Sequence, residues 1–348
     1  MDLSYFNARI RGLKGRLLDK KDYESFVAIE TPLEYLDRLR STPYGPYIET
    51  AEARTKDVDA IISGALKQDL VRTFSFLWKI APDEARPLVK TLISVWEVYN
   101  LKAVIRGIVK GVKRDDIRAV LVPVGEFDSA ALNELLASKD VGEVMRFLQT
   151  WGSPYAVPLK EGYAEFARHR NVIELELRLD HFVFDILVSN LREKSVDTLI
   201  IREMVETRID VQNIMTLMKI VGEGYTRQGA ESFFIEGGKR LQRELFLDLS
   251  ALKTRDEVIV RLLEEIRDGE ITGALKDADY EQIGLLEELF NEAVEKRLAK
   301  ISIVEPLSIA LAASYVHAKI REIKNLRILL RAKVFGIPRE ELRRFLIL

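Results

Sequence analysis

Hydrophobic positions recur along most of this chain at the spacing of an α-helix. Between Val172 and Leu187, for example, apolar side chains follow one another at intervals of three or four residues, which is the repeat of one helix face. The one short β-like piece covers residues 119–124, is bounded by Pro123 and Gly125, and lacks the convincing alternation of a half-buried strand. The pattern therefore predicts a chain that is nearly all α-helix.

One stretch of this pattern occurs three times. Counted from an Asn, each copy has an acid at −3, apolar residues at −2, +1, +4 and +5, a base at +6 and Gly at +11. The three residues, Asn100, Asn213 and Asn325, lie 113 and 112 positions apart, and a looser relative without the acid opens the chain around Asn7. Several independent matches at two nearly equal offsets are hard to obtain by chance. The sequence therefore predicts three copies of one unit.

Helix-start signals recur at nearly the same interval. They begin at Thr31, Asp140 and Thr254, each followed three residues later by Glu, and Thr31 is also followed by Pro32. An N-cap residue with Glu at the third helical position predicts a capping box, and Pro suits the first helical position. Each unit should therefore contain a capped helix, a turn, further helices and finally the Asn-bearing helix.

The predicted fold is all-α, with three pseudo-threefold-related helical bundles that form a funnel. We expect helical repeats over residues 1–112, 113–224 and 225–348, because a period near 112 residues exceeds the roughly 30 to 50 residues of common helical solenoid units. The chain opens with a relative of the helix that ends each unit. The N-terminal helix could therefore pack beside the C-terminal one and close the three units into a ring or funnel.

The common spacing within the repeated stretch predicts which of its faces is buried. At 100° per residue, positions −2, +1, +4 and +5 share an arc roughly 120° wide. The acid at −3 lies within this arc and the Asn lies on its edge, so we expect both to bond to neighbouring helices in preference to forming a ligand site. The Gly at +11 predicts a helix C-cap that requires a positive φ.

The opposite face of the repeated helix is basic. A basic stripe is usually a solvated face, which is the favoured interpretation here. Repetition in the same register leaves a second interpretation open, in which the stripe lines a shared axis and holds an acidic or polar partner. Nucleic acid is a weaker alternative, since the compact interleaving of aromatic and basic residues is missing. The basic residues are Lys102, Arg106, Lys110, Lys219, Lys324, Arg327 and Arg331, with Glu223 the only acid.

Composition limits the class of protein further. The 348 residues, 47% apolar and 31% charged, describe a globular chain too long for one ordinary core. The longest near-apolar run, at residues 307–316, falls short of the ~20 residues of a membrane span. The N-terminus lacks an apolar signal region, so we expect a cytoplasmic protein. The absence of Cys suits a reducing compartment, and a net charge of −2 argues against a general nucleic-acid binder.

Candidate catalytic groups are scarce. The three histidines, His169, His181 and His317, show no metal-binding spacing. The glycines near lysine do not match a phosphate-binding loop, no carboxylate pair stands out, and no Ser sits in a nucleophile elbow. The sequence therefore predicts neither an enzyme nor a cofactor or metal site.

Several motifs that coincide with the repeats resemble a known family. Residues 5–18, followed by Asp22-Tyr23, resemble the opening of the C subunit of archaeal and bacterial V-type (A-type) ATP synthases. That protein is the counterpart of the d subunit in eukaryotic vacuolar ATPases. The stretch from Tyr99 to Gly107 is similar to its first internal repeat. The closing signature of the family is matched at residues 305–307, 319, 323–327 and 336–340.

The resemblance implies a non-catalytic rotor subunit of a rotary ATPase. It implies an all-helical, pseudo-threefold funnel, peripheral on the cytoplasmic face of the membrane, that sits on the proteolipid ring and receives the foot of the central stalk. Such a subunit transmits torque for proton or sodium-ion transport, while other subunits carry the ATP chemistry. The residues by themselves leave a general helical scaffold for soluble partners as the alternative.

The resemblance also suggests a role for the basic stripe. We hypothesise that five of its residues face the funnel mouth and contact the stalk; the alternative is that they face outward and that loops line the mouth. The middle repeat departs most from the family, with Met215 at +2, so its share of this surface is the least supported. The five residues are Lys102, Arg106, Lys219, Arg327 and Arg331.

Overall fold

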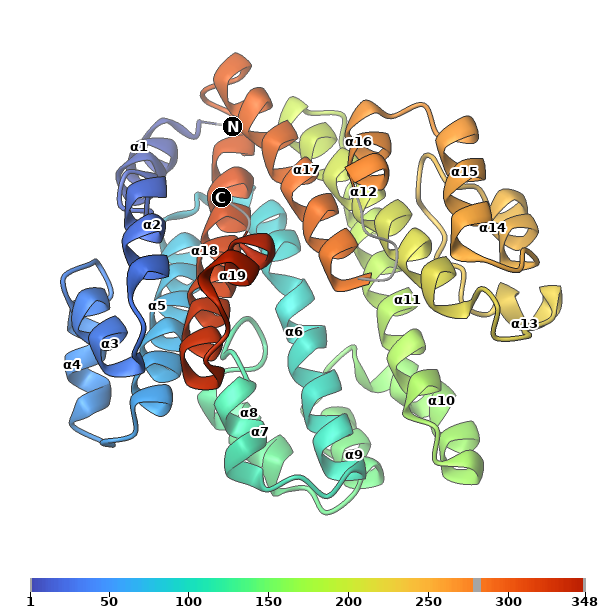
Figure 1. Cartoon of the computed structure of the whole chain (residues 1–348). Coiled ribbons are helices and arrows are strands. Elements are labelled where there is room, and N and C mark those ends of the chain that lie inside the picture. The colour runs from blue at the N-terminus through green and yellow to red at the C-terminus, as the bar shows by residue number, and fades with distance from the viewer. Residues whose placement is uncertain (1, 278–282, 347–348) are drawn as a thin grey trace.

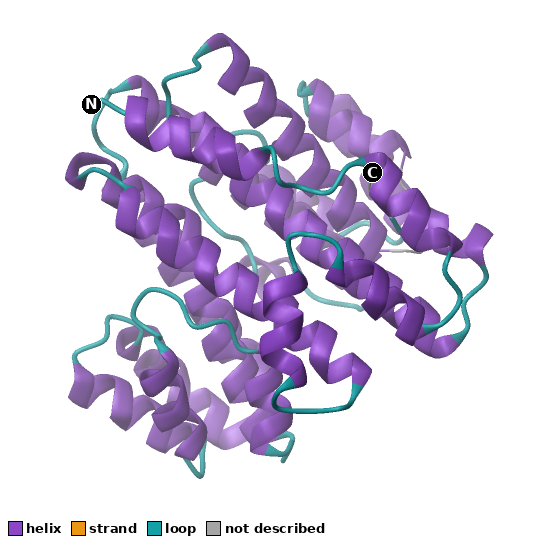
Figure 2. Ribbon diagram, turned by 90° about the vertical axis from the view of Figure 1, so that its left-hand side faces the viewer, coloured by secondary structure: helices purple, strands orange, loops and turns teal. Residues whose placement is uncertain are grey.

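The described part of the chain is helical throughout. The computed structural model describes residues 2–277 and 283–346, without the side chains of 277, 283–285 and 344. These residues form nineteen α-helices and one 3-10 turn (η1, Asp83–Ala85). Figure 2 shows the helices joined by loops. In place of a strand, the β-like piece provides one isolated bridge between Val124 and Phe127. The all-α prediction is confirmed.

The helices differ widely in length, and six of them are long. The first group runs α1 (Ser4–Lys14), α2 (Lys20–Ala28), α3 (Pro32–Arg40), α4 (Gly45–Glu52), α5 (Val58–Ile80) and α6 (Arg86–Val109). The second runs α7 (Arg114–Val120), α8 (Ser129–Ala137), α9 (Val141–Trp151), α10 (Ala156–His169), α11 (Val172–Asn190) and α12 (Val196–Ile220). The last runs α13 (Arg227–Glu231), α14 (Arg243–Ser250), α15 (Arg255–Glu265), α16 (Gly269–Asp277), α17 (Ile283–Val304), α18 (Ala310–Phe335) and α19 (Arg339–Phe345).

The six long helices pack in a closed circuit. In the order α5, α6, α11, α12, α17, α18, each packs against the next, and α18 returns to α5. In addition α12 contacts both α6 and α18 (Figure 1). The repeated Asn residues lie on α6, α12 and α18. The three copies of the repeated stretch are therefore brought together in the middle of the fold.

Short capped helices precede each long pair. The side chains of Thr31, Asp140 and Thr254 accept from backbone N–H groups at the starts of α3, α9 and α15, as predicted. Of these three, only Thr254 forms a complete capping box, so that part of the prediction is wrong for the other two. Glu34 is exposed to solvent, and Glu143 accepts from the backbone of Lys139 at 2.7 Å instead of from the N-cap residue.

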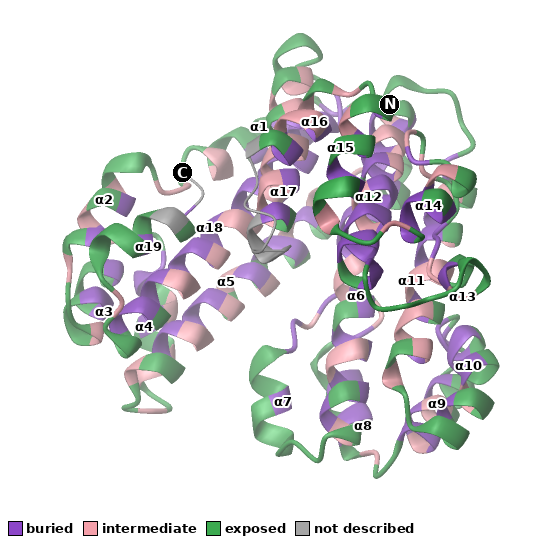
Figure 3. Cartoon of the chain, turned by 45° about the vertical axis from the view of Figure 1, so that its right-hand side comes forward, coloured by how far each residue is buried: buried purple, intermediate pink, exposed green. Residues whose placement is uncertain are grey.

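The ends of the chain are packed together. Helix α1 packs against α18 (Figure 1), and α2 packs against α19 (Figure 3). Asn7 donates a hydrogen bond to the carbonyl of Ser308 at 3.1 Å, and Lys333 donates to the carbonyl of Ile29 at 3.0 Å. The N-terminal helices are thereby tied to the last long helix.

Buried side chains form two clusters. The larger one extends through α1–α11, the first half of α12 and α18, and the smaller one joins the second half of α12 to α13–α17. Figure 3 shows buried residues where the long helices pack and exposed residues over the short helices at the periphery. The boundaries after residues 112 and 224 and the funnel shape stay predictions.

Candidate functional site

In two copies, the repeated Asn hydrogen-bonds both the N–H and the C=O of one distant residue. Asn100 on α6 donates to the carbonyl of Val122 at 2.6 Å and accepts from the N–H of the same residue at 2.8 Å. Asn213 on α12 makes the same pair of bonds to Ile235, at 2.8 and 2.9 Å. Both partners lie 22 residues after the Asn. The predicted structural role is thus confirmed for Asn100 and Asn213, but their partners lie in the following loop and not in a neighbouring helix, and the bonds satisfy buried backbone groups of that loop.

The repeated acid is also buried and hydrogen-bonded. Glu97 accepts from the Tyr155 hydroxyl at 2.6 Å and from a backbone N–H at 2.8 Å. Glu322 likewise accepts from the Tyr44 hydroxyl at 2.6 Å, and Asp210 accepts from three successive backbone N–H groups at 3.1 to 3.2 Å. Burial raises the pKa of Glu97, although its hydrogen bonds oppose that shift. Glu97 and Asp210 therefore hold loops that follow them, whereas Glu322 holds Tyr44, near the start of the chain.

Glycine permits the close approach of two of these acids. A Cβ on Gly125, whose φ is +57°, would lie 1.8 Å from an oxygen of Glu97. On Gly238 it would lie 2.4 Å from an oxygen of Asp210. Both glycines follow their acid by 28 residues. The Gly predicted to end the repeated helix has a positive φ in all three copies, at Gly111, Gly224 and Gly336. The C-cap prediction is nevertheless wrong for Gly224, because α12 already ends at Ile220 and is followed by Val221 in an extended conformation.

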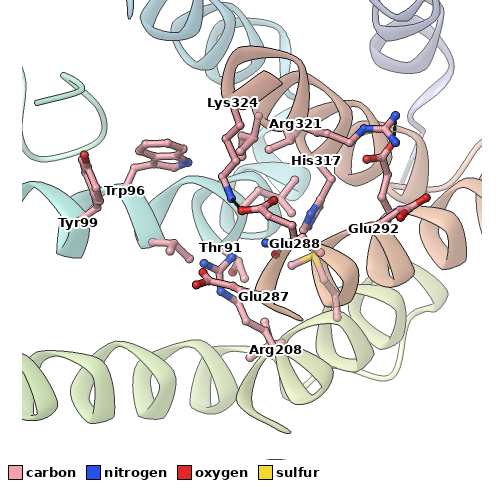
Figure 4. A pocket seen from close by; sticks show the side chains of 18 of the residues that line it. Thr91, Trp96, Tyr99, Arg208, Glu287, Glu288, Glu292, His317, Arg321 and Lys324 are labelled. Atoms are coloured by element: carbon pink, nitrogen blue, oxygen red, sulfur yellow. Dashed lines mark hydrogen bonds and ion pairs between the residues drawn. The ribbon is translucent and has the colours of Figure 1, made fainter. Parts of the chain in front are cut away.

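The three repeated helices line one common cavity of about 290 Å³ (Figure 4). α17 contributes many of the remaining side chains. Nine of the residues that the three helices contribute occupy the same offsets from their Asn, at −9, −8 and −5. In chain order, −9 is Thr91, Met204 and Val316; −8 is Leu92, Val205 and His317; and −5 is Val95, Arg208 and Ile320. We call this space the central cavity.

Charged groups gather around the central cavity. Figure 4 shows Arg208, Glu287 and His317 at its centre. Arg208 lines the cavity, and the surrounding protein lowers the pKa of Arg208 by desolvation, partly offset by Glu287. At its edge Lys324 pairs with Glu288 at 2.6 Å. The cavity could thus hold a polar or charged group.

Acid should destabilise the protein through His317. Burial, together with Arg208 and Lys324, lowers the pKa of His317 from 6.5 to about 3. The folded state therefore prefers neutral His317, and the stabilisation that is present above pH 6.5 is lost as the pH falls toward 3. We expect the advantage of wild type over His317→Gln in free energy of unfolding to shrink by about 2 kcal/mol between pH 7 and pH 4.5.

Urea unfolding at several pH values measures this advantage. His169, which is exposed on α10, provides a matched control through His169→Gln. A wild-type advantage over His317→Gln that stays constant with pH would contradict the assignment.

Two of the five hypothesised partner residues already have partners within the chain. Lys102 pairs with Asp180, and Arg106 pairs through two nitrogens with Glu176. Both acids lie on α11. Lys102, Arg106 and Asp180 line a second cavity of about 570 Å³, which adjoins the central cavity because Tyr99 lines both.

The other three residues are placed differently. Arg327 and Arg331 line a third cavity of about 780 Å³ between α18, α5 and α7. Lys219 is exposed on α12 and lines none of these three cavities. The five side chains are therefore distributed over two cavities and an exposed position of α12.

The sequence analysis did not predict that the residues at −9, −8 and −5, among them Arg208 and His317, line a common cavity. The signal was weak, because those positions share no residue type among the three copies. They share only their offset from the Asn. That offset indicates a common cavity only when the three helices are known to converge.

The described residues contain neither a metal cluster nor a membrane span. No group of three or more His, Asp or Glu side chains in the described part of the chain could hold a metal ion. Of the helices that the structure describes, none combines the length and the hydropathy needed to cross a bilayer.

The fold and the site define a class of all-helical proteins in which three copies of one helix converge and hold neighbouring parts of the chain in place. Residues 6–345 match the family model described as ATP synthase (C/AC39) subunit. The chain therefore belongs to this family, whose members are accessory and not catalytic subunits of a rotary ATPase. The resemblance found in the sequence and the prediction of a non-enzymatic role are both confirmed.

Archaeal relatives match over nearly the whole chain. The C subunit of the A-type ATP synthase of Methanocaldococcus jannaschii is 26% identical, covering 99% of this chain and 86% of that protein. The corresponding protein of Haloquadratum walsbyi is 28% identical, covering 97% and 96%. That of Archaeoglobus fulgidus is 26% identical, covering 99% and 96%.

Proposed function

We propose that this chain is the rotor socket of an A-type or V-type ATP synthase. It couples the central stalk to the proteolipid ring, on the cytoplasmic side of the membrane, and transmits torque during proton or sodium-ion transport. The convergence of three copies of one helix on a central cavity carries the proposal, because such an arrangement turns the same face of one repeated helix toward a common axis from three sides. The family to which the chain belongs supports it.

A socket that passes torque must resist twisting. The closed circuit of long helices favours stiffness, since each long helix in it packs against a neighbour on both sides. Buried polar groups add fixed ties: Glu322 on α18 accepts from the backbone N–H of Leu18 at 2.6 Å and from the Tyr44 hydroxyl. A load applied to α18 would thereby reach the N-terminal helices directly.

The proposed stalk surface consists of Lys102, Arg106, Lys219, Arg327 and Arg331. Within it the two α18 arginines should contribute most. Lys102 and Arg106 are neutralised by α11 carboxylates and would need to exchange partners on binding. Arg331 is exposed on the wall of a cavity, so an acidic stalk segment could reach it without breaking an existing ion pair.

Reversing the charge of Arg331 should weaken binding to the central stalk. We expect Arg331→Glu to reduce affinity about tenfold at low salt, and less at high salt, because an attractive contact becomes a repulsive one. Calorimetric titration with purified stalk subunits measures the change. Lys160→Glu, on an exposed position of α10, is the matched control. Equal affinities for both variants would remove Arg331 from the surface.

The function itself is tested by a pull-down. The purified chain is offered detergent-solubilised proteolipid ring and, separately, the central-stalk subunits. Binding to both, with no ATP hydrolysis by the chain alone, is the expected result. Binding to neither would reject the socket and leave a general helical scaffold.

A further inference from the structure

A basic groove lies between α5, α7 and α18. This cavity of about 780 Å³, which we call the arginine groove, falls within the range of small-molecule sites. Its floor on α5 is built of small residues, among them Ala60, Ser63 and Gly64. They leave space between the helices and supply a hydroxyl group.

Positive charge in the arginine groove exceeds negative charge. Asp115 forms an ion pair with Arg118, and Asp59 is the only other acid in the lining. Five cations against two acids leave a formal excess of three positive charges. The cations are Arg54, Lys67, Arg118, Arg327 and Arg331.

No described carboxylate outside the groove neutralises the excess through an ion pair to its arginines. Among the described residues, no carboxylate forms an ion pair with Arg54, Arg327 or Arg331. Lys67 donates to the carbonyl of Arg118 at 2.7 Å and so brings a further ammonium group to the cluster. Burial, and with it repulsion from Arg331, lowers the pKa of Arg327, as expected where cations lack a counter-charge.

We propose that the arginine groove binds a small molecule carrying two or more phosphate groups. Guanidinium groups match phosphate oxygens through parallel N–H bonds, and a lysine adds a point charge. An excess of three positive charges suits a polyphosphate better than a single anion. The hydroxyl of Ser63 and the amide of Gln68, both in the lining, provide neutral donors.

The lining favours a small polyanion over an acidic protein segment. Protein interfaces usually centre on large apolar or aromatic anchors, whereas the larger apolar side chains of this groove are only Val71, Val120 and Leu330. The inference goes beyond the proposed function, because the isolated chain can be tested for it. Competition with the stalk for Arg327 and Arg331 would follow only if the socket proposal also holds.

Calorimetric titration of the full chain with tripolyphosphate tests the site. We expect saturable binding that weakens as salt rises from about 50 mM to about 300 mM. Arg327→Gln and Arg331→Gln should each reduce affinity about tenfold or more, since each removes charge-assisted hydrogen bonds. Lys160→Gln is the control: Lys160 is exposed on α10 and lies outside the groove lining. It should bind like wild type.

A substitution of an uncharged lining residue tests the site without altering any of its arginines. Ser63→Glu places an acid on the groove floor and should abolish binding, while circular dichroism and the melting temperature check that each variant is folded. ATP and vesicles of an anionic phospholipid then compete with tripolyphosphate, so that displacement by one or the other assigns a free phosphate ligand or a lipid headgroup. No binding of tripolyphosphate, an equal loss in Lys160→Gln, or a response to an acidic peptide alone would overturn the proposal.

Discussion

Replacing Lys319 by Met should lower the free energy of unfolding by about 3–5 kcal/mol, the cost of breaking a buried ion pair. Lys319 is 6% exposed. Its ammonium lies 2.7 Å from Asp69 and 2.8 Å from Glu322, and it donates to the Tyr44 hydroxyl at 3.1 Å. Without the cation, two buried carboxylates on α5 and α18 would face each other uncompensated.

Urea unfolding of the variant and of Lys300→Met measures this cost. Lys300 is 75% exposed in its side chain, and it pairs with Glu270 at a distance of 3.7 Å, so its loss should cost less than about 1 kcal/mol. Similar losses in both variants would show that the buried cluster contributes little.

Alkaline pH provides a second test of Lys319. Burial by itself lowers the pKa of Lys319, but Glu322 and Asp69 outweigh it and raise the pKa from 10.5 to about 12. A folded pKa above the unfolded one gives stabilisation that is complete below pH 10.5 and lost as the pH rises through 12. The advantage of wild type over Lys319→Met should therefore shrink across this window. An advantage that does not change with pH would contradict the ionised pair.

Replacing Arg240 by Met should also cost about 3–5 kcal/mol, because one cation serves several carboxylates. Arg240, 11% exposed in its side chain, lies 2.6 Å from both Glu203 and Asp268 and 3.4 Å from the buried Asp210. The variant would leave these acids on α12 and before α16 without that cation. Urea unfolding against Arg243→Met measures the effect. Arg243 is 45% exposed in its side chain, and its loss should cost less than about 1 kcal/mol.

The loss of stability in Arg240→Met should depend on pH in the acidic range. Burial tends to raise the pKa of Asp268, but hydrogen bonds from the backbone of Ile271 and the charge of Arg240 outweigh it, so the pKa is lowered below 3.8. The corresponding stabilisation is present above pH 3.8 and lost as the pH falls below it. The difference between wild type and Arg240→Met should shrink in that range; a difference that grows would exclude the proposed pairing.

Local features of the fold could be predicted because their causes are local. Apolar spacing indicated the helices, and Thr31, Asp140 and Thr254 marked three helix starts. An N-cap bond spans three residues, so the sequence carries the whole signal. Complete capping boxes were less predictable. Glu143 accepts from the backbone N–H of Lys139, one residue before the expected N–H of Asp140, and these two neighbouring donors are nearly equivalent local partners.

The candidate site was less predictable because its contacts join distant parts of the chain. Lys102 and Arg106 meet acids 78 and 70 residues away on α11. Their spacing on α6 placed them on one helix face, but the facing charges depend on how α6 and α11 pack. The same applies to Arg327, which shares its groove with Lys67 of α5.

The sequence alone determined an almost entirely helical chain with three copies of one helix and a family resemblance. Helical periodicity repeats every few residues, and the acid and Asn of each copy keep their spacing, so none of this required a structure. Tertiary packing decided that positions −9, −8 and −5 enclose the central cavity and that Arg240 compensates Asp210. The physical reason is that a helix face becomes a wall or a core only through the elements placed against it.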